Sequence, residues 1–119
     1  MSRDPGLYLD DILQAIARIH EYVQGLEYDD FERDRKTFDA VVRNLEVIGE
    51  AARALPDSVK QQSSQVEWPK LVGLRNILIH QYFGISARIV WDLVCTRLRP
   101  LETVCKELSD SSTEDPPVS

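Results

Sequence analysis

Hydrophobic residues recur at every third or fourth position along much of the chain, which is the spacing of one buried helix face. In residues 7–25 the predicted inward stripe consists of Leu9, Ile12, Leu13, Ile16, Ile19, Tyr22 and Val23. In residues 36–55 it consists of Phe38, Val41, Val42, Leu45, Ile48, Ala52 and Leu55. We therefore expect two long amphipathic helices. Gly25 and Pro56 are the expected ends, because glycine suits a helix terminus and proline cannot continue the hydrogen-bond ladder.

Shorter signals lie between and after these two stretches. Asp29 or Asp30 can cap a brief second helix with Phe31 near its start. Residues 57–67 are polar and predict only a short helical turn. A further helix is expected from about residue 70 to residue 82, with Pro69 in its first turn.

The last predicted helix spans residues 87–108, with Ser86 as its cap and Gly84 ending the helix before it. Its predicted inward residues are Ile89, Val90, Leu93, Val94, Leu98, Leu101, Val104 and Leu108. Pro100 lies inside this helix and should kink or split it. The pattern predicts an all-α fold, an antiparallel bundle of four to five helices forming one domain over residues 1–108. Residues 109–119 have the composition of a disordered acidic tail.

Composition limits the classes of protein that fit. The chain has 119 residues, 43% of them hydrophobic, which suits one domain with a real core. The net charge of −6 argues against nucleic acid as a partner, but residues 35–108 carry eleven basic and eight acidic side chains. A local basic surface is therefore compatible with the sequence.

Other counts favour a cytoplasmic protein without cofactor or metal. The acidic start and the absence of a long apolar run predict neither a signal peptide nor a membrane span. Cys95 and Cys105 stand ten positions apart in one predicted helix, about 15 Å, too far to bridge. We expect both to be reduced. No zinc-ligand spacing is present.

The helix predicted over residues 70–82 combines an apolar surface with unusual polar groups. Its apolar residues cover most of the circumference, which predicts burial on several sides. Gly73, Asn76 and His80 share one wedge, at about 100° per residue, and Arg75 and Tyr82 lie nearly in line on another edge.

Two interpretations of these polar groups stay open on the residues alone. In the structural one, Arg75 pairs with an internal acid, Glu46 or Glu50, while His80 is a satisfied core histidine and Tyr82 packs by its ring. In the functional one they line a cleft or a subunit interface, where Arg75 holds a phosphate and His80 moves a proton.

A short motif and two longer sequence blocks, one of which contains it, resemble a known family. RNILIHQY at 75–82 fits the R-x4-H-x-Y signature of HEPN-domain ribonucleases. RNLEVIGEAARAL at 43–55 and WPKLVGLRNILIHQYFGI at 68–85 are similar to two signature blocks of the HepT-like toxins. The resemblance covers roughly residues 7–108.

The resemblance implies an HEPN-like bundle that forms a homodimer, with two sets of Arg75 and His80 lining one cleft. It implies RNA cleavage without a metal, with tRNA as the substrate class. It also implies a partner, a minimal nucleotidyltransferase antitoxin of the MntA type. That partner transfers AMP to the motif tyrosine, here Tyr82, and silences the nuclease.

A mechanism follows from these implied roles as a hypothesis. A ribose 2′-OH attacks the neighbouring phosphorus; His80 supplies the proton transfers and Arg75 stabilises the developing charge. Asn76 stands one turn before His80 and orients the imidazole or the phosphate. AMP on Tyr82 adds bulk and negative charge that repel RNA.

Rival functions belong to other classes. The chain is alternatively a non-catalytic substrate-binding subunit that presents substrate to a minimal nucleotidyltransferase, or a plain helical dimerisation module. The Arg75/His80 pair favours the nuclease, because a binding subunit does not need it. Growth arrest on expression of the chain alone, relieved by its partner, discriminates among these functions.

Several other residues receive structural interpretations. Glu46 and Glu50 are expected to pair with Arg75 or Arg53, and Gly49 to permit close helix approach. His20 is expected to be solvated. The expected packing residues are Trp68 and Trp91. Arg88, Arg97, Arg99 and Lys70 fit either phosphate contacts or solvated helix faces.

Overall fold

The computed structural model describes residues 3–81 and 84–113, with side chains up to Asp110. Within these ranges every regular element is a helix, which confirms the predicted all-α class. The helices are α1 (Pro5–Val23), α2 (Tyr28–Arg33), α3 (Arg35–Ala54), α4 (Asp57–Lys60), α5 (Trp68–His80), α6 (Ala87–Thr96) and α7 (Leu98–Thr113).

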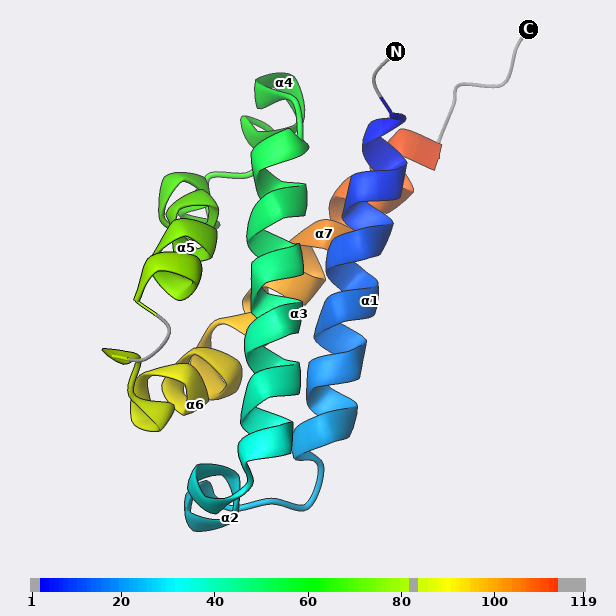
Figure 1. The fold of residues 1–119 in the computed structure, drawn as a ribbon. Coiled ribbons are helices and arrows are strands. Elements are labelled where there is room, and N and C mark those ends of the chain that lie inside the picture. Colours follow the sequence, from blue (N-terminus) through cyan, green and yellow to red (C-terminus); the bar gives the residue numbers. More distant parts are fainter. Residues whose placement is uncertain (1–2, 82–83, 114–119) are drawn as a thin grey trace, which may run out of the picture.

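The bundle is built around α3. Figure 1 shows α1 and α3 side by side, with α7 crossing behind them. α5 lies on the other side of α3 from α1, at the edge of the molecule, and packs mainly on α3. The short helices α2 and α4 lie at opposite ends of the bundle.

The core consists of the apolar stripes that the sequence predicts for the long helices. All seven residues assigned to the inward stripe of α3 are buried, from Phe38 to Leu55. Two expectations were wrong. Tyr22, in the last turn of α1, is 38% exposed, and Ile89, in the first turn of α6, is 60% exposed. In α6 the buried residues are Val90 and Val94, one turn apart, and Ile89 points about 100° away from Val90.

Side-chain caps fix where several helices begin. Asp4 accepts a hydrogen bond from the Gly6 amide at 2.8 Å, and Asp34 accepts one from the Thr37 amide at 3.1 Å. α2 is capped by Glu27, not by Asp29 or Asp30 as expected. Asp30 instead accepts a hydrogen bond from the Glu27 amide at 2.9 Å, because it lies at the third helical position.

The last predicted helix is split, as Pro100 suggested. α6 ends at Thr96, and α7 begins at Leu98. Pro100 therefore stands in the first turn of α7, where its missing N–H breaks no intrahelical hydrogen bond. α7 continues to Thr113, so residues 109–113 are helical where a disordered tail was expected. Residues 114–119 lie outside the described part.

Both cysteines are free, as predicted. Cys95 is exposed, whereas Cys105 is buried in the core. Burial raises the pKa of the Cys105 thiol from its ordinary 9.0 to about 12, because the thiolate would lose its hydration. None of the described helices is long and apolar enough to cross a membrane.

Candidate active site

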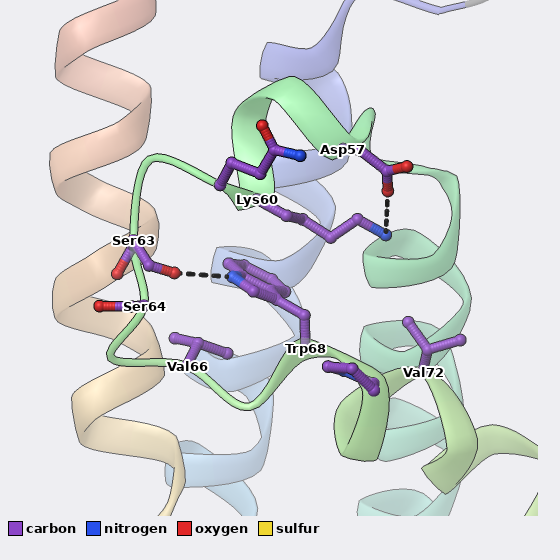
Figure 2. A pocket seen from close by; sticks show the side chains of 9 residues that line it. Asp57, Lys60, Ser63, Ser64, Val66, Trp68 and Val72 are labelled. Atoms are coloured by element: carbon purple, nitrogen blue, oxygen red, sulfur yellow. Dashed lines mark hydrogen bonds and ion pairs between the residues drawn. The ribbon is translucent and has the colours of Figure 1, made fainter.

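The candidate site is built on α5, whose start is held by a buried tryptophan. Trp68 is the first residue of the helix, and its indole Nε1 donates a hydrogen bond to the Ser63 carbonyl at 3.2 Å. Figure 2 shows this bond closing the loop that leads into α5. Only 7% of Trp68 is exposed, which supports the packing role favoured from the sequence.

A glycine lets α5 approach α3 closely, as predicted for Gly49. A Cβ atom added at Gly49 would lie 3.0 Å from the Cβ of Arg75 and 3.1 Å from the Arg75 backbone nitrogen. It would also lie 3.2 Å from the Leu71 carbonyl oxygen. Because two of these neighbours are backbone atoms, a side chain at position 49 would force the helices apart. Gly49 therefore fixes where Arg75 sits.

Arg75 pairs with the acid beside that glycine. Its Nε lies 2.6 Å from a carboxylate oxygen of Glu50, which confirms one of the two pairings that the structural interpretation proposed. The Arg75 side chain is 35% exposed and that of Glu50 is 56% exposed. Glu46 pairs instead with Arg43, at 3.4 Å. The guanidinium is thus held by its own chain but remains open to solvent.

His80 and Asn76 lie on a part of α5 that the rest of the chain leaves bare. Both are exposed, and neither has a side-chain hydrogen bond or ion pair within residues 3–81 and 84–110. They stand four positions apart and share a face with Gly73 and Ile77. We call Gly73, Asn76, Ile77 and His80 the uncovered face of α5.

The expectation that this helix is buried on several sides was wrong for the single chain. Within α5 only Trp68 and Leu78 are buried. Ile77 and Ile79 are 49% and 43% exposed, because α5 packs on α3 along one side. His80 is likewise exposed rather than a satisfied core histidine. The predicted alignment of Tyr82 with Arg75 falls outside the described residues.

Gly73 lies at the N-terminal end of the uncovered face, and no close contact with the described residues requires a glycine there. A Cβ atom added there would meet nothing within 4 Å. Glycine in a helix interior costs about 1 kcal/mol relative to alanine. The sequence signal for this position was its place in the wedge with Asn76 and His80.

The hollows of the surface lie elsewhere. An open one of about 410 Å³ surrounds Trp68 at the start of α5, where Lys60 also donates to the Ala52 carbonyl at 3.0 Å. Another, of about 260 Å³, lies between α3, α5, α6 and α7. Neither is lined by Arg75, Asn76 or His80. No metal-binding group of three or more donors occurs among the described residues.

For two residues outside α5, the environment predicted from the sequence was right in one case and wrong in the other. Trp91 packs on Phe31, with ring centroids 5.1 Å apart, as expected. His20 was expected to be solvated, which was wrong. Its Nε2 is buried and has no hydrogen-bond partner within the described part of the chain.

Comparison with known proteins places the chain in a family. The model of a family described as ribonuclease HepT-like matches residues 12–108. The chain belongs to the ribonuclease HepT-like family. It is 39% identical to a "Putative RNase" of Caldanaerobacter subterraneus subsp. tengcongensis, over 89% of this chain and 95% of that protein.

Two archaeal relatives are of similar closeness. A "Putative RNase" of Methanocaldococcus jannaschii is 37% identical over 89% of this chain and 91% of its own length. The "Probable ribonuclease HepT" of Thermococcus cleftensis is 39% identical over 79% of this chain and 86% of its own length. No solved structure matches the chain significantly.

In this HepT-like chain, the predicted site residues fall into two groups. Asn76 and His80 share the uncovered face, where an imidazole can exchange protons with a bound molecule. Arg75 leans toward α3 and Glu50, at the border of that face, where a guanidinium can hold an anion. Glu50, for which the sequence favoured a structural pairing, contacts the candidate site through Arg75.

Proposed function

We propose that this chain is the ribonuclease toxin of a toxin–antitoxin pair and that it cleaves RNA in a cleft formed by two copies. One observation carries the proposal. His80 and Asn76 lie exposed on the helix that carries Arg75, without a side-chain hydrogen bond or ion pair to any residue that the structure describes, in a member of a ribonuclease family. A histidine or asparagine that served only the packing of its own chain would be buried and hydrogen-bonded there, whereas these two side chains are open to a bound molecule.

The chemistry needs no group beyond the side chains present. The ribose 2′-oxygen attacks the adjacent phosphorus, the bond to the 5′-oxygen breaks, and a cyclic phosphate forms. His80 takes the proton of the 2′-OH or gives one to the leaving 5′-oxygen, because an imidazole titrates near neutral pH. Arg75 holds the phosphate and stabilises its added negative charge. The reaction is metal-independent in this proposal.

Glu50 fits this mechanism as the holder of Arg75 before substrate arrives. A partly exposed ion pair exchanges partners at little cost, since its net contribution to stability is about 1 kcal/mol or less. A phosphate that approaches the uncovered face can therefore replace the carboxylate, or share the Arg75 guanidinium with it. The close approach of the helices at Gly49 keeps the Arg75 backbone in place during this exchange.

Dimerisation through the uncovered face is supported by its composition. Ile77 is half exposed and Gly73 has open space above it, so a second helix can approach closely. Two copies related by a twofold axis would bring two His80 and two Arg75 side chains to one cleft.

Regulation and substrate rest on the family resemblance. Tyr82 follows His80 by two residues in the sequence. In the proposal, a minimal nucleotidyltransferase antitoxin transfers AMP to Tyr82, and the added charge repels RNA, with tRNA as the substrate class. Mass measurement of the chain purified with and without this partner tests the modification, which adds whole AMP masses at Tyr82.

The test of the nuclease is a single substitution with a matched neighbour. His80→Ala is expected to lower the rate of RNA cleavage by about 10²- to 10⁴-fold, while helicity and oligomeric state persist. Gln81→Ala, a change at the next exposed position, should retain cleavage. Undiminished cleavage by a folded His80→Ala chain would remove the proposed catalytic role.

The neutralisation of Arg75 by Glu50 favours a second candidate, the non-catalytic substrate-binding subunit of a nucleotidyltransferase. That candidate predicts binding without cleavage and no growth arrest when the chain is expressed alone. The nuclease predicts both cleavage and arrest, and loss of both in His80→Ala.

A further inference from the structure

The hollow between α3, α5, α6 and α7 has no assigned role. Its volume is about 260 Å³, just below the 300 Å³ or so at which pockets for drug-sized ligands begin. Its apolar lining consists of Leu45, Ile48, Val66, Leu71, Leu74, Leu93, Leu98, Pro100 and Leu101. Ile48 and Leu101 are buried, so the floor of the hollow is part of the core.

The hollow follows from how the surrounding helices are placed. α5 packs mainly on α3, and the helix break at Arg97 separates α6 from α7. Leu71 and Leu74 of α5 and Leu93 of α6 line the same hollow. Protein interiors are otherwise packed closely enough that few such spaces remain.

The charged side chains at the rim of this hollow are those of Glu67, Lys70 and Arg97. Lys70 and Glu67 form an ion pair at 2.6 Å, with side chains 80% and 54% exposed, and so neutralise each other. Arg97 is exposed and has no side-chain hydrogen bond or ion pair within the described residues. Arg97 has only a weak electrostatic effect on Glu67. The pKa of Glu67 is lowered first by the hydrogen bond from Lys70, and Arg97 contributes last. The rim thus offers one unpaired positive charge.

We propose that this hollow binds a small organic acid with an apolar body and one carboxylate. The body would lie against the leucines, and the carboxylate would pair with the Arg97 guanidinium. The volume excludes a lipid with two acyl chains. A neutral molecule would leave Arg97 without a partner, and a cation would be repelled by it.

Binding of this class of ligand is independent of the proposed nuclease activity. None of the residues that line the hollow belongs to the uncovered face, although Leu71 and Leu74 are on the same helix as Arg75. Carrying out the experiment on the His80→Ala chain as well as on the unaltered chain separates the two proposals, since ligand binding should be equal in both.

The probe is octanoate, titrated into the full chain with methyl-labelled leucine and followed by NMR and calorimetry. Saturable binding is expected, with shifts of the Leu74 and Leu93 methyl groups. Arg97→Gln should weaken octanoate binding about tenfold, the usual worth of a charge-assisted hydrogen bond, and should leave 1-octanol binding unchanged. Arg99→Gln is the matched control and should leave both ligands unaffected, because Arg99 is exposed and does not line the hollow.

Filling variants test the location. Leu93→Trp should abolish binding of both probes. If Leu93→Trp does not fold, Leu74→Phe on the facing wall takes its place and should have the same effect. No saturable octanoate binding at millimolar concentration would overturn the proposal. So would equal effects of Arg97→Gln and Arg99→Gln, or retained binding in a folded filling variant. An affinity that falls as protein concentration rises would also overturn it, because the hollow would then belong to an interface between copies.

Discussion

α3 and α5 are neighbouring helices that use their surfaces in opposite ways. α3 buries its whole predicted stripe and is covered by α1 on one side and α5 on the other. α5 buries Trp68 and Leu78 and leaves Ile77, Ile79 and His80 exposed. Both helices carry an internal glycine, yet Gly49 is in tight contact and Gly73 is in open space. The exposed isoleucines and the open space at Gly73 are what the proposed contact between two copies would use.

The largest difference in stability is expected between truncating an isoleucine in the core and truncating one on the uncovered face of α5. Ile16, on α1 against α3, is fully buried, whereas Ile77 is 49% exposed. Ile16→Ala is expected to lower the free energy of unfolding by about 2–5 kcal/mol, because it leaves a cavity. Ile77→Ala should lower it by less than about 1 kcal/mol at concentrations where the chain is monomeric. Chemical denaturation measures both, and equal losses in the monomer would contradict the assignment of Ile77 to a bare face.

Alanine substitutions at Gly49 and Gly73 compare the packing of α3 and α5 by adding one methyl group to each helix. Gly49→Ala places a Cβ 3.0 Å from that of Arg75 and should destabilise the chain by about 1–2 kcal/mol, despite the better helix propensity of alanine. Gly73→Ala meets no neighbour and should stabilise the monomer by about 0.5–1 kcal/mol. Thermal unfolding of dilute protein reads out both, and effects of the same sign would show that the two environments do not differ as described.

The smallest expected effect is on the ion pair that joins the two helices. Glu50→Gln should lower stability by less than about 1 kcal/mol, since both side chains are partly exposed. Glu46→Gln is the matched control, because Glu46 pairs within α3 with Arg43. If Glu50 holds Arg75 for the substrate, Glu50→Gln changes RNA cleavage more than Glu46→Gln does. Equal rates in the two variants would leave Glu50 with only a structural role.

The sequence predicted the long helices well because their stripes report burial within one chain. The stripe of α3 and the close approach at Gly49 were both foreseen, and so was the break near Pro100. The helical extension over residues 109–113 was missed because its serines and acids resemble a tail, although they continue an established helix.

The sequence predicted the environment of α5 less well, for a physical reason. A sequence pattern predicts burial for any apolar residue and does not show whether its own chain, a second chain or solvent covers it. The burial predicted for Ile77 and Ile79 was therefore the same as that predicted for Leu78. The choice between Glu46 and Glu50 for Arg75 needed the helix crossing at Gly49, which periodicity does not give. His20 shows the converse, since nothing in its helical pattern indicated a buried Nε2.

The most direct test of the account is to block the uncovered face of α5 and to measure mass and RNA cleavage together. Gly73→Leu is compared with Ala17→Leu, a similar enlargement at an exposed position of α1. Sedimentation equilibrium should show the unaltered chain and Ala17→Leu as active dimers, and Gly73→Leu as a folded, inactive monomer. A Gly73→Leu chain that still dimerises and cleaves RNA, or an unaltered chain that cleaves as a monomer, would contradict the account.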